Sequence, residues 1–287
     1  MKIKFYRRQI GNKLLKFILK NEGRLKYILR FIPLDLNKKK YLCIGLPRSG
    51  THSMERILKS EFGLNGRHEP QAIVILDYIV NDFKEEHGKN AEQFIILREK
   101  LFRYQFESSY YQIFLVPYFV KLFPNSFYIL TIRNPIDWVN SMMNFAIRKN
   151  YKINDLWGKY ICKIAGDIEV IGRQEKDLKE TLTLHYLKYY KMHIDLALKN
   201  IPKEQLLIMD TYEINDSFDE IAKFIKVKNK KIDLDFHGGK NKHKIKVEIS
   251  KEVIKQSNEI CEYFIQKGIV HFKKYQIIIN DNYLKDT

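Results

Sequence analysis

Residues 41–53 read YLCIGLPRSGTHS, an apolar run followed by a loop that begins and ends with glycine. The run Tyr41–Ile44 predicts a buried parallel strand, and residues 51–62 space their apolar side chains as one face of a helix does. Gly45 and Gly50 allow the backbone between these elements to approach a ligand closely, so that successive N–H groups can face an anion. The stretch therefore predicts a phosphate-binding loop.

The rest of the chain alternates apolar runs with helical patterns. Strands are predicted at residues 127–132 and 206–209, a further strand end near 66–70, and helices at 71–83, 92–122, 135–149, 178–200, 218–225 and 250–267. This alternation predicts a three-layer α/β fold, with a central parallel sheet flanked by helices as in P-loop NTPases. We expect residues 41–287 to form one domain and residues 1–40 to form a basic helical extension.

The chain is strongly basic, because 51 Lys and Arg against 34 Asp and Glu give a net charge of +17 over 287 residues. The positive electrostatic field of such a chain favours anionic partners: a nucleotide, a nucleic acid, an acidic glycan or a membrane surface. Residues 1–40 have the pattern of a basic amphipathic helix, which either binds an anionic membrane or packs on the domain. With no membrane-spanning run and no signal peptide, the expected location is cytoplasmic, with peripheral contact at the inner membrane face.

The cysteines do not indicate a metal site. Cys43, Cys162 and Cys261 are widely separated, and no Cys/His group has the spacing of metal ligands. We therefore expect free thiols and no metal.

The loop at residues 45–50 departs from the triphosphate-binding motif at its last glycine. That motif continues with lysine, which reaches the β and γ phosphates, but here Gly50 is followed by Thr51 and His52. Arg48 lies inside the loop, and its planar guanidinium can bind a single phosphate with two donors. The residues therefore favour a phosphate other than a magnesium-bound triphosphate.

Residues 47–51, Pro-Arg-Ser-Gly-Thr, resemble the 5′-phosphosulfate loop of sulfotransferases that use 3′-phosphoadenosine 5′-phosphosulfate (PAPS). Arginine after the proline resembles the carbohydrate and tyrosylprotein branches more than the cytosolic small-molecule branch. The resemblance covers roughly residues 40–270 and implies a P-loop-like fold, PAPS as co-substrate and transfer to an acceptor hydroxyl. The residues it implies for binding within the loop and the helix start are Arg48, Ser49, Gly50, Thr51, His52 and Ser53.

A second segment is similar to the same family's 3′-phosphate site. Arg133 follows the strand at 127–132, and Ser141 comes eight residues later in the helix that Pro135 begins. Ligands of open α/β sheets bind at the carboxyl ends of the strands, where Arg133 is expected. The resemblance therefore assigns Arg133 and Ser141 to the 3′-phosphate.

The candidate general base lies in residues 66–70, Gly-Arg-His-Glu-Pro. The resemblance implies Glu69, because the carbohydrate and tyrosylprotein branches use a glutamate at about this position. His68 is the rival, since the cytosolic branch uses a histidine, although farther from its loop. Arg48 is expected to stabilise charge on the leaving phosphate, and His52 can donate to the same oxygens. The predicted catalytic set is Glu69, Arg48 and His52.

Two other functions stay open at this stage. A P-loop kinase would need a magnesium-binding carboxylate at a strand end, where Asp210 is the obvious one. A non-catalytic basic protein would bind membrane or nucleic acid. No nucleic-acid module pattern is present, so no nucleic-acid partner is expected. The aromatic residues of 71–122 suit the sugar rings of a carbohydrate or glycolipid acceptor, although an aromatic helical core is the favoured interpretation. The basic loop 237–244 either closes over the 3′-phosphate or is a solvated charge run.

Overall fold

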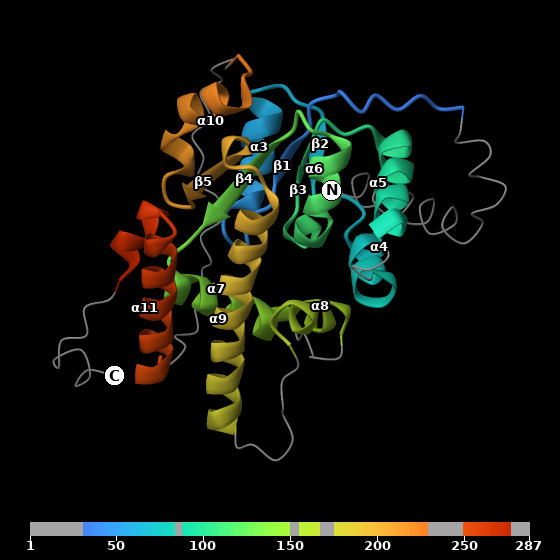
Figure 1. Ribbon diagram of the computed structural model, residues 1–287. Coiled ribbons are helices and arrows are strands. Elements are labelled where there is room, and N and C mark those ends of the chain that lie inside the picture. The colour runs from blue at the N-terminus through green and yellow to red at the C-terminus, as the bar shows by residue number, and fades with distance from the viewer. Residues whose placement is uncertain (1–30, 84–87, 150–154, 167–174, 229–248, 277–287) are drawn as a thin grey trace.

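Five parallel strands form the central sheet in the order β2-β3-β1-β4-β5 (Figure 1). The computed structural model describes residues 31–83, 88–149, 155–166, 175–228 and 249–276. The strands are β1 (Tyr41–Cys43), β2 (Gly66–His68), β3 (Phe106–Ser108), β4 (Phe127–Ile132) and β5 (Leu206–Asp210). Tyr41 lies opposite Phe106 on one side and Phe127 on the other, so β1 is the middle strand.

Alternate residues of β1 enter two separate cores, because successive side chains of a strand point to opposite faces. Tyr41 and Cys43 pack in the smaller core, under α3 (Thr51–Ser60) and α10 (Phe218–Ile225). Leu42 packs in the larger core on the other face. The helices that contribute to that core are α4 (Ala72–Asp77), α5 (Gly88–Phe102), α6 (Val116–Leu122), α7 (Pro135–Lys149), α8 (Leu156–Ala165), α9 (Glu175–Asn200) and α11 (Lys251–Gln266).

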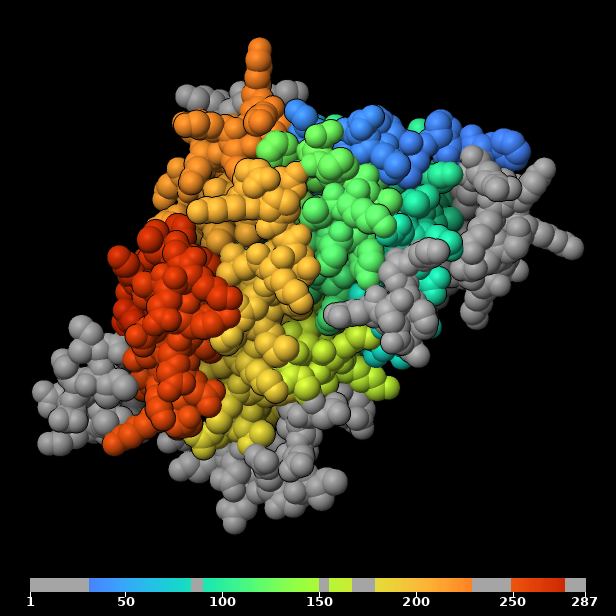
Figure 2. Space-filling model, in the orientation of Figure 1, coloured from blue at the N-terminus to red at the C-terminus, as the bar shows by residue number. Residues whose placement is uncertain are grey.

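The larger layer is built around the long helix α9. Helices α7, α8 and α11 all pack against it, and Figure 1 shows it running past them below the sheet. On the surface, α9 stays visible as a band between α11 and α6 (Figure 2). The short helical turns are η1 (Tyr78–Asp82), η3 (Tyr110–Leu115), η4 (Lys203–Gln205), η5 (Ile214–Asp216) and η6 (Val270–Tyr275).

The predicted three-layer α/β fold with a parallel sheet is confirmed. Residues 92–122 are mainly helical, as predicted, but the prediction missed β3, which interrupts them between α5 and α6. This strand has only three residues, and its central Glu107 is a charged residue that is fully buried. The sequence of β3 is not an apolar run, because Glu107 occupies its centre. That carboxylate is buried together with its ion-pair partner Arg98.

Several predicted features fall outside the described residues. They are residues 1–30 of the basic extension and the basic loop 237–244. Within the part that the structure describes, no helix combines the length and apolar character needed to cross a membrane. The same residues contain no cluster of His, Cys, Asp and Glu that could hold a metal ion.

Candidate active site

The strand order gathers the predicted site residues at one edge of the sheet. All five strands are parallel, so their carboxyl ends meet there. The phosphate loop leaves β1 in the middle, Arg133 follows β4 and Thr211 follows β5 on one side. Ser108 ends β3 and Glu69 follows β2 on the other side. Segments far apart in the sequence are thereby neighbours.

Both glycines of the loop stand where a side chain would not fit. A Cβ on Gly45 would lie 1.8 Å from the hydroxyl oxygen of Thr131. Gly50 has a φ of 88°, and a Cβ there would approach the Ile214 side chain at 2.6 Å. Gly50 also precedes the first turn of α3, whose N–H groups have no intrahelical partner and which contains no acidic residue. The loop therefore presents backbone donors and a positive helix end to a ligand.

The Ser49 side chain points into the loop and is fully buried. Its hydroxyl lies 2.6 Å from the carbonyl oxygen of Leu46 and 2.9 Å from that of Thr131. Its backbone N–H also donates to the Leu46 carbonyl, at 3.1 Å. The structure therefore places Ser49 where it shapes the loop from inside.

Three side chains from other elements hold the loop by its carbonyl oxygens. Trp138 Nε1 of α7 donates to the oxygen of Pro47 at 2.6 Å. The Thr211 hydroxyl lies 2.8 Å from the oxygen of Ser49, and His193 Nε2 of α9 lies 2.8 Å from that of Ile44. Trp138 lies within the segment that resembles the 3′-phosphate site, but the sequence does not predict the role of these three residues, because each acts on a backbone carbonyl that only the tertiary fold brings close.

His193 is neutral and fixed in one tautomer. It is fully buried, and burial lowers its pKa to about 4, outweighing the hydrogen bond to Ile44. Since the Ile44 carbonyl can only accept, Nε2 carries the proton and Nδ1 can accept from the Tyr189 hydroxyl, 3.4 Å away. An uncharged donor thus supports the end of β1 from the core side.

Arginines from two predicted segments meet beside the loop. Arg48 Nε lies 3.4 Å from the hydroxyl oxygen of Ser141, which is 93 residues away in the sequence. Burial lowers the pKa of Arg48, and the nearby charges of Arg148 and Arg133 lower it further. Like charges in a partly buried place repel one another unless an anion lies between them. The cluster is therefore suited to an anionic ligand.

Arg133 has a donor available within this cluster. Its Nε is buried and has no hydrogen-bond partner among the described residues. Its carbonyl accepts from the Tyr190 hydroxyl at 2.6 Å, and its guanidinium lies 5.5 Å from the ring centre of Tyr212. The Tyr212 hydroxyl in turn donates to Asp137 at 2.6 Å. The backbone and one face of Arg133 are thus held in place, while its buried Nε has no hydrogen-bond partner among the described residues.

The candidate base lies across the loop from the arginines. Glu69 has a φ of 46° and a side chain that is 25% exposed, and its N–H donates to the Ser108 carbonyl at 3.0 Å. Its carboxylate lies 3.8 Å from Nε2 of His68, which is 3.2 Å from the Thr51 hydroxyl. Burial raises the pKa of Tyr110, and the charge of Glu69 raises it further. Glu69 and His68 thus both lie beside the start of α3.

The remaining predicted residues occupy the first turn of α3. The Thr51 side chain is buried and that of Ser53 is partly buried. His52 is 74% exposed, with Nδ1 3.2 Å from a carboxylate oxygen of Glu55 and its ring centre 4.9 Å from that of His68. The structure therefore places His52 at the rim of the site, beside an acidic partner on its own helix.

A model of the sulfotransferase domain family matches residues 40–234, more than half of the chain. The chain belongs to the sulfotransferase domain family. It is a sulfotransferase, and the family's co-substrate is PAPS.

Solved sulfotransferases of low identity also align with the chain. One from Alicyclobacillus acidocaldarius is 14% identical over 82% of this chain and 98% of its own, with a TM-score of 0.47. One from Mycobacterium avium is 10% identical over 86% and 72%, with a TM-score of 0.41. The sulfotransferase domain of the Synechococcus PCC 7002 olefin synthase is 11% identical over 68% and 76%, with a TM-score of 0.39. A comparison with curated proteins finds no match.

The residues of this sulfotransferase fit a donor with two separated phosphate groups. The glycine-bracketed loop and the start of α3 suit one anion, and the Arg133 donor suits a second. Arg48 lies between these positions, since it belongs to the loop and contacts Ser141.

Proposed function

We propose that this sulfotransferase transfers the sulfuryl group of PAPS to a hydroxyl of a carbohydrate or glycolipid, with Glu69 as general base. The carrying observation is the contact between Arg48 and Ser141, which joins the two predicted phosphate segments at the sheet edge that also holds Glu69. The proposal makes residues 41–287 the catalytic domain and residues 1–40 a basic extension that contacts the inner face of the membrane.

The donor side of the site uses charge without a metal. The 5′-phosphosulfate lies against Gly50, the N–H groups of residues 51–53 and the Arg48 guanidinium. Arg133 and Ser141 hold the 3′-phosphate. Charge-assisted hydrogen bonds of this kind contribute about 1.5–3 kcal/mol each, so several account for firm nucleotide binding. In this arrangement Ser49 serves the loop, because its hydroxyl and N–H are both directed to the Leu46 carbonyl.

Transfer follows from a carboxylate on one side of the loop and cations on the other. The acceptor hydroxyl gives its proton to Glu69 while its oxygen forms a bond to sulfur. The bond between sulfur and the bridging phosphate oxygen breaks, and its electron pair stays on that oxygen. Arg48 stabilises the resulting charge, with His52 as an additional donor at the rim. A positioned base of this kind contributes about 10²–10⁴-fold to the rate.

An aromatic ring next to Arg48 supports a ring-shaped acceptor. The Arg48 guanidinium lies 5.4 Å from the ring centre of Phe145, and Phe145 lies 6.2 Å from the ring centre of Trp157. Trp157 is buried in the larger core, whereas Phe145 is only partly buried. An aromatic face presents apolar area of the shape that a sugar ring covers. The positive charge of Arg148 next to Arg48 favours an acceptor that is itself acidic.

Two measurements test the proposed function. The first titrates the protein with adenosine 3′,5′-bisphosphate, ATP and a short oligonucleotide; tight binding of ATP alone or of the oligonucleotide alone would contradict it. The second incubates the protein with PAPS carrying labelled sulfate and a panel of glycans, glycolipids, tyrosine peptides and simple phenols, followed by mass analysis. Glu69→Gln and Arg48→Ala should each abolish transfer, and Glu69→Gln should leave bisphosphate binding intact. Full activity in Glu69→Gln rejects the base assignment.

A further inference from the structure

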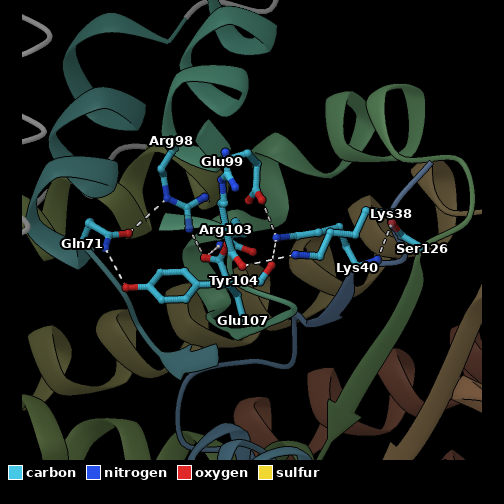
Figure 3. A network of polar contacts seen from close by, with 10 residues as sticks. Lys38, Lys40, Gln71, Arg98, Glu99, Arg103, Tyr104, Glu107 and Ser126 are labelled. Atoms are coloured by element: carbon cyan, nitrogen blue, oxygen red, sulfur yellow. Dashed lines mark hydrogen bonds and ion pairs between the residues drawn. The ribbon is translucent and has the colours of Figure 1, made fainter. Parts of the chain in front are cut away.

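A network of charged and polar side chains, most of them buried, includes Gln71, which follows Glu69 by two residues (Figure 3). It contains two ion pairs, Arg98 with Glu107 and Lys40 with Glu99. The side chains of Arg98, Glu107 and Lys40 are each at most 1% exposed. Such complete burial removes these charges from water, and replacing buried ion pairs by apolar residues is often neutral or stabilising in proteins. A contribution to folding stability is therefore a weak explanation for the presence of this network.

Arg98 joins the two chain segments that border the Glu69 turn. Its Nε donates to the Gln71 side chain at 3.2 Å, and its Nη2 donates to Glu107. Gln71 stands two residues after Glu69, at the start of α4. Glu107 immediately precedes Ser108, whose carbonyl accepts the N–H of Glu69. One guanidinium thus fixes α4 relative to β3, with Glu69 between them.

The turn needs such support because its backbone is strained. Glu69 and Gln71 have φ values of 46° and 52°, in the left-handed region that costs a non-glycine residue about 1–3 kcal/mol. The Gln71 amide also donates to the Tyr104 hydroxyl at 3.4 Å, and the Tyr111 hydroxyl donates to the Pro70 carbonyl at 2.9 Å. Strained residues persist only where their surroundings hold them, and here the holding bonds come from α5, β3 and the segments next to it.

We propose that Gln71 and Arg98 are positioning residues that hold the Glu69 carboxylate in line with the acceptor hydroxyl. This inference rests on the proposed role of Glu69 as base. The second ion pair of the same network provides a control. Lys40 and Glu99 are also buried, and the hydrogen bonds of their side chains among the described residues are with one another and with the Tyr104 carbonyl. Their charges act on Arg98 and Glu107, so Glu99→Gln changes the electrostatics of the network but keeps the hydrogen bonds that Arg98 and Gln71 make.

The decisive variant is Gln71→Met, which keeps the length of the side chain and the Arg98–Glu107 pair but removes both amide hydrogen bonds. It is compared with Glu99→Gln, and turnover is followed with PAPS and whichever panel acceptor is sulfated. Gln71→Met should lower kcat about tenfold, because small displacements of a catalytic group cost one to two orders of magnitude. The KM for PAPS and the affinity for adenosine 3′,5′-bisphosphate should stay within about twofold. Glu99→Gln should lower Tm while kcat stays within about twofold of wild type.

A further readout separates positioning from general loosening. Hydrogen exchange of the peptide covering residues 66–75 should accelerate in Gln71→Met and not in Glu99→Gln. These variants leave Arg98 in place, because its removal would leave Glu107 buried and unpaired and could unfold the chain.

The outcomes distinguish the positioning role of Gln71 and Arg98 from the base role of Glu69. Wild-type kcat in Gln71→Met, or a loss no larger than that in Glu99→Gln, overturns the positioning role while an inactive Glu69→Gln keeps the base role. Full activity in Glu69→Gln overturns the base role and the positioning proposal together.

Discussion

Replacing Arg133 by glutamine should weaken nucleotide binding only for ligands that carry a 3′-phosphate. In the proposed site the 3′-phosphate accepts hydrogen bonds from the guanidinium of Arg133, whose Nε has no hydrogen-bond partner among the described residues. Losing a charge-assisted hydrogen bond costs about 1.5–3 kcal/mol, and each 1.4 kcal/mol is tenfold in Kd. We therefore expect the Kd of adenosine 3′,5′-bisphosphate to rise by about 10- to 150-fold, measured by isothermal titration calorimetry at fixed ionic strength.

Adenosine 5′-monophosphate is the matched ligand, because it lacks only the 3′-phosphate. Its Kd should change by less than about threefold in Arg133→Gln. Arg148→Gln is the matched variant, since it removes the same charge near Arg48 and should weaken both ligands to a similar, smaller extent. Folding stability should hold or rise in Arg133→Gln, because repulsion with Arg48 is relieved. An equal loss of affinity for both nucleotides in Arg133→Gln would refute the assignment of Arg133 to the 3′-phosphate.

Two other predictions concern the scaffold of the loop. Gly45→Ala should lower both Tm and nucleotide affinity, because its Cβ would lie 1.8 Å from the Thr131 hydroxyl oxygen. Adding Thr131→Ala removes that oxygen and should restore part of both quantities. A double variant that restores neither would contradict this cause. The pKa of His193 falls to about 4 in the fold from an ordinary 6.5, so its contribution to stability is complete above pH 6.5 and is lost as the pH falls towards 4. The loss in the free energy of unfolding is on the order of 3 kcal/mol. In His193→Gln the free energy of unfolding, measured with urea, should therefore depend less on pH between 6.5 and 4. An unchanged pH dependence would show that other groups cause it.

The strands that could be predicted are those whose own residues determine them. Tyr41–Ile44 and Phe127–Ile132 are apolar runs bounded by turn residues, so their local pattern is enough to predict these two strands and their places along the chain. The strand β3 could not be predicted, because Glu107 is stabilised inside the core by Arg98 from α5. A buried charge is recognisable only once its partner is known, and that partner is a property of the tertiary fold.

The candidate site divides in the same way. Arg48, Arg133 and Ser141 belong to short motifs, and the structure brings all three together. Trp138, although it lies in the second motif, and His193 bind the carbonyls of Pro47 and Ile44, and the sequence does not predict such contacts with the backbone. A motif thus identifies the residues that face a ligand more readily than the residues that hold the motif in shape.

The strand order separates the two kinds of charge that sulfuryl transfer needs. With β1 in the middle, the segments after β4 and β5 place Arg133 on one side of the phosphate loop, and those after β3 and β2 place Glu69 on the other. A carboxylate next to the arginines would neutralise them, compete with the phosphates and lose basicity. Here the Glu69 carboxylate lies 3.8 Å from Nε2 of His68, while the charges that lower the pKa of Arg48 are those of Arg148 and Arg133. The parallel topology thus gives the proposed anion site and the proposed base separate positions along one edge of the sheet.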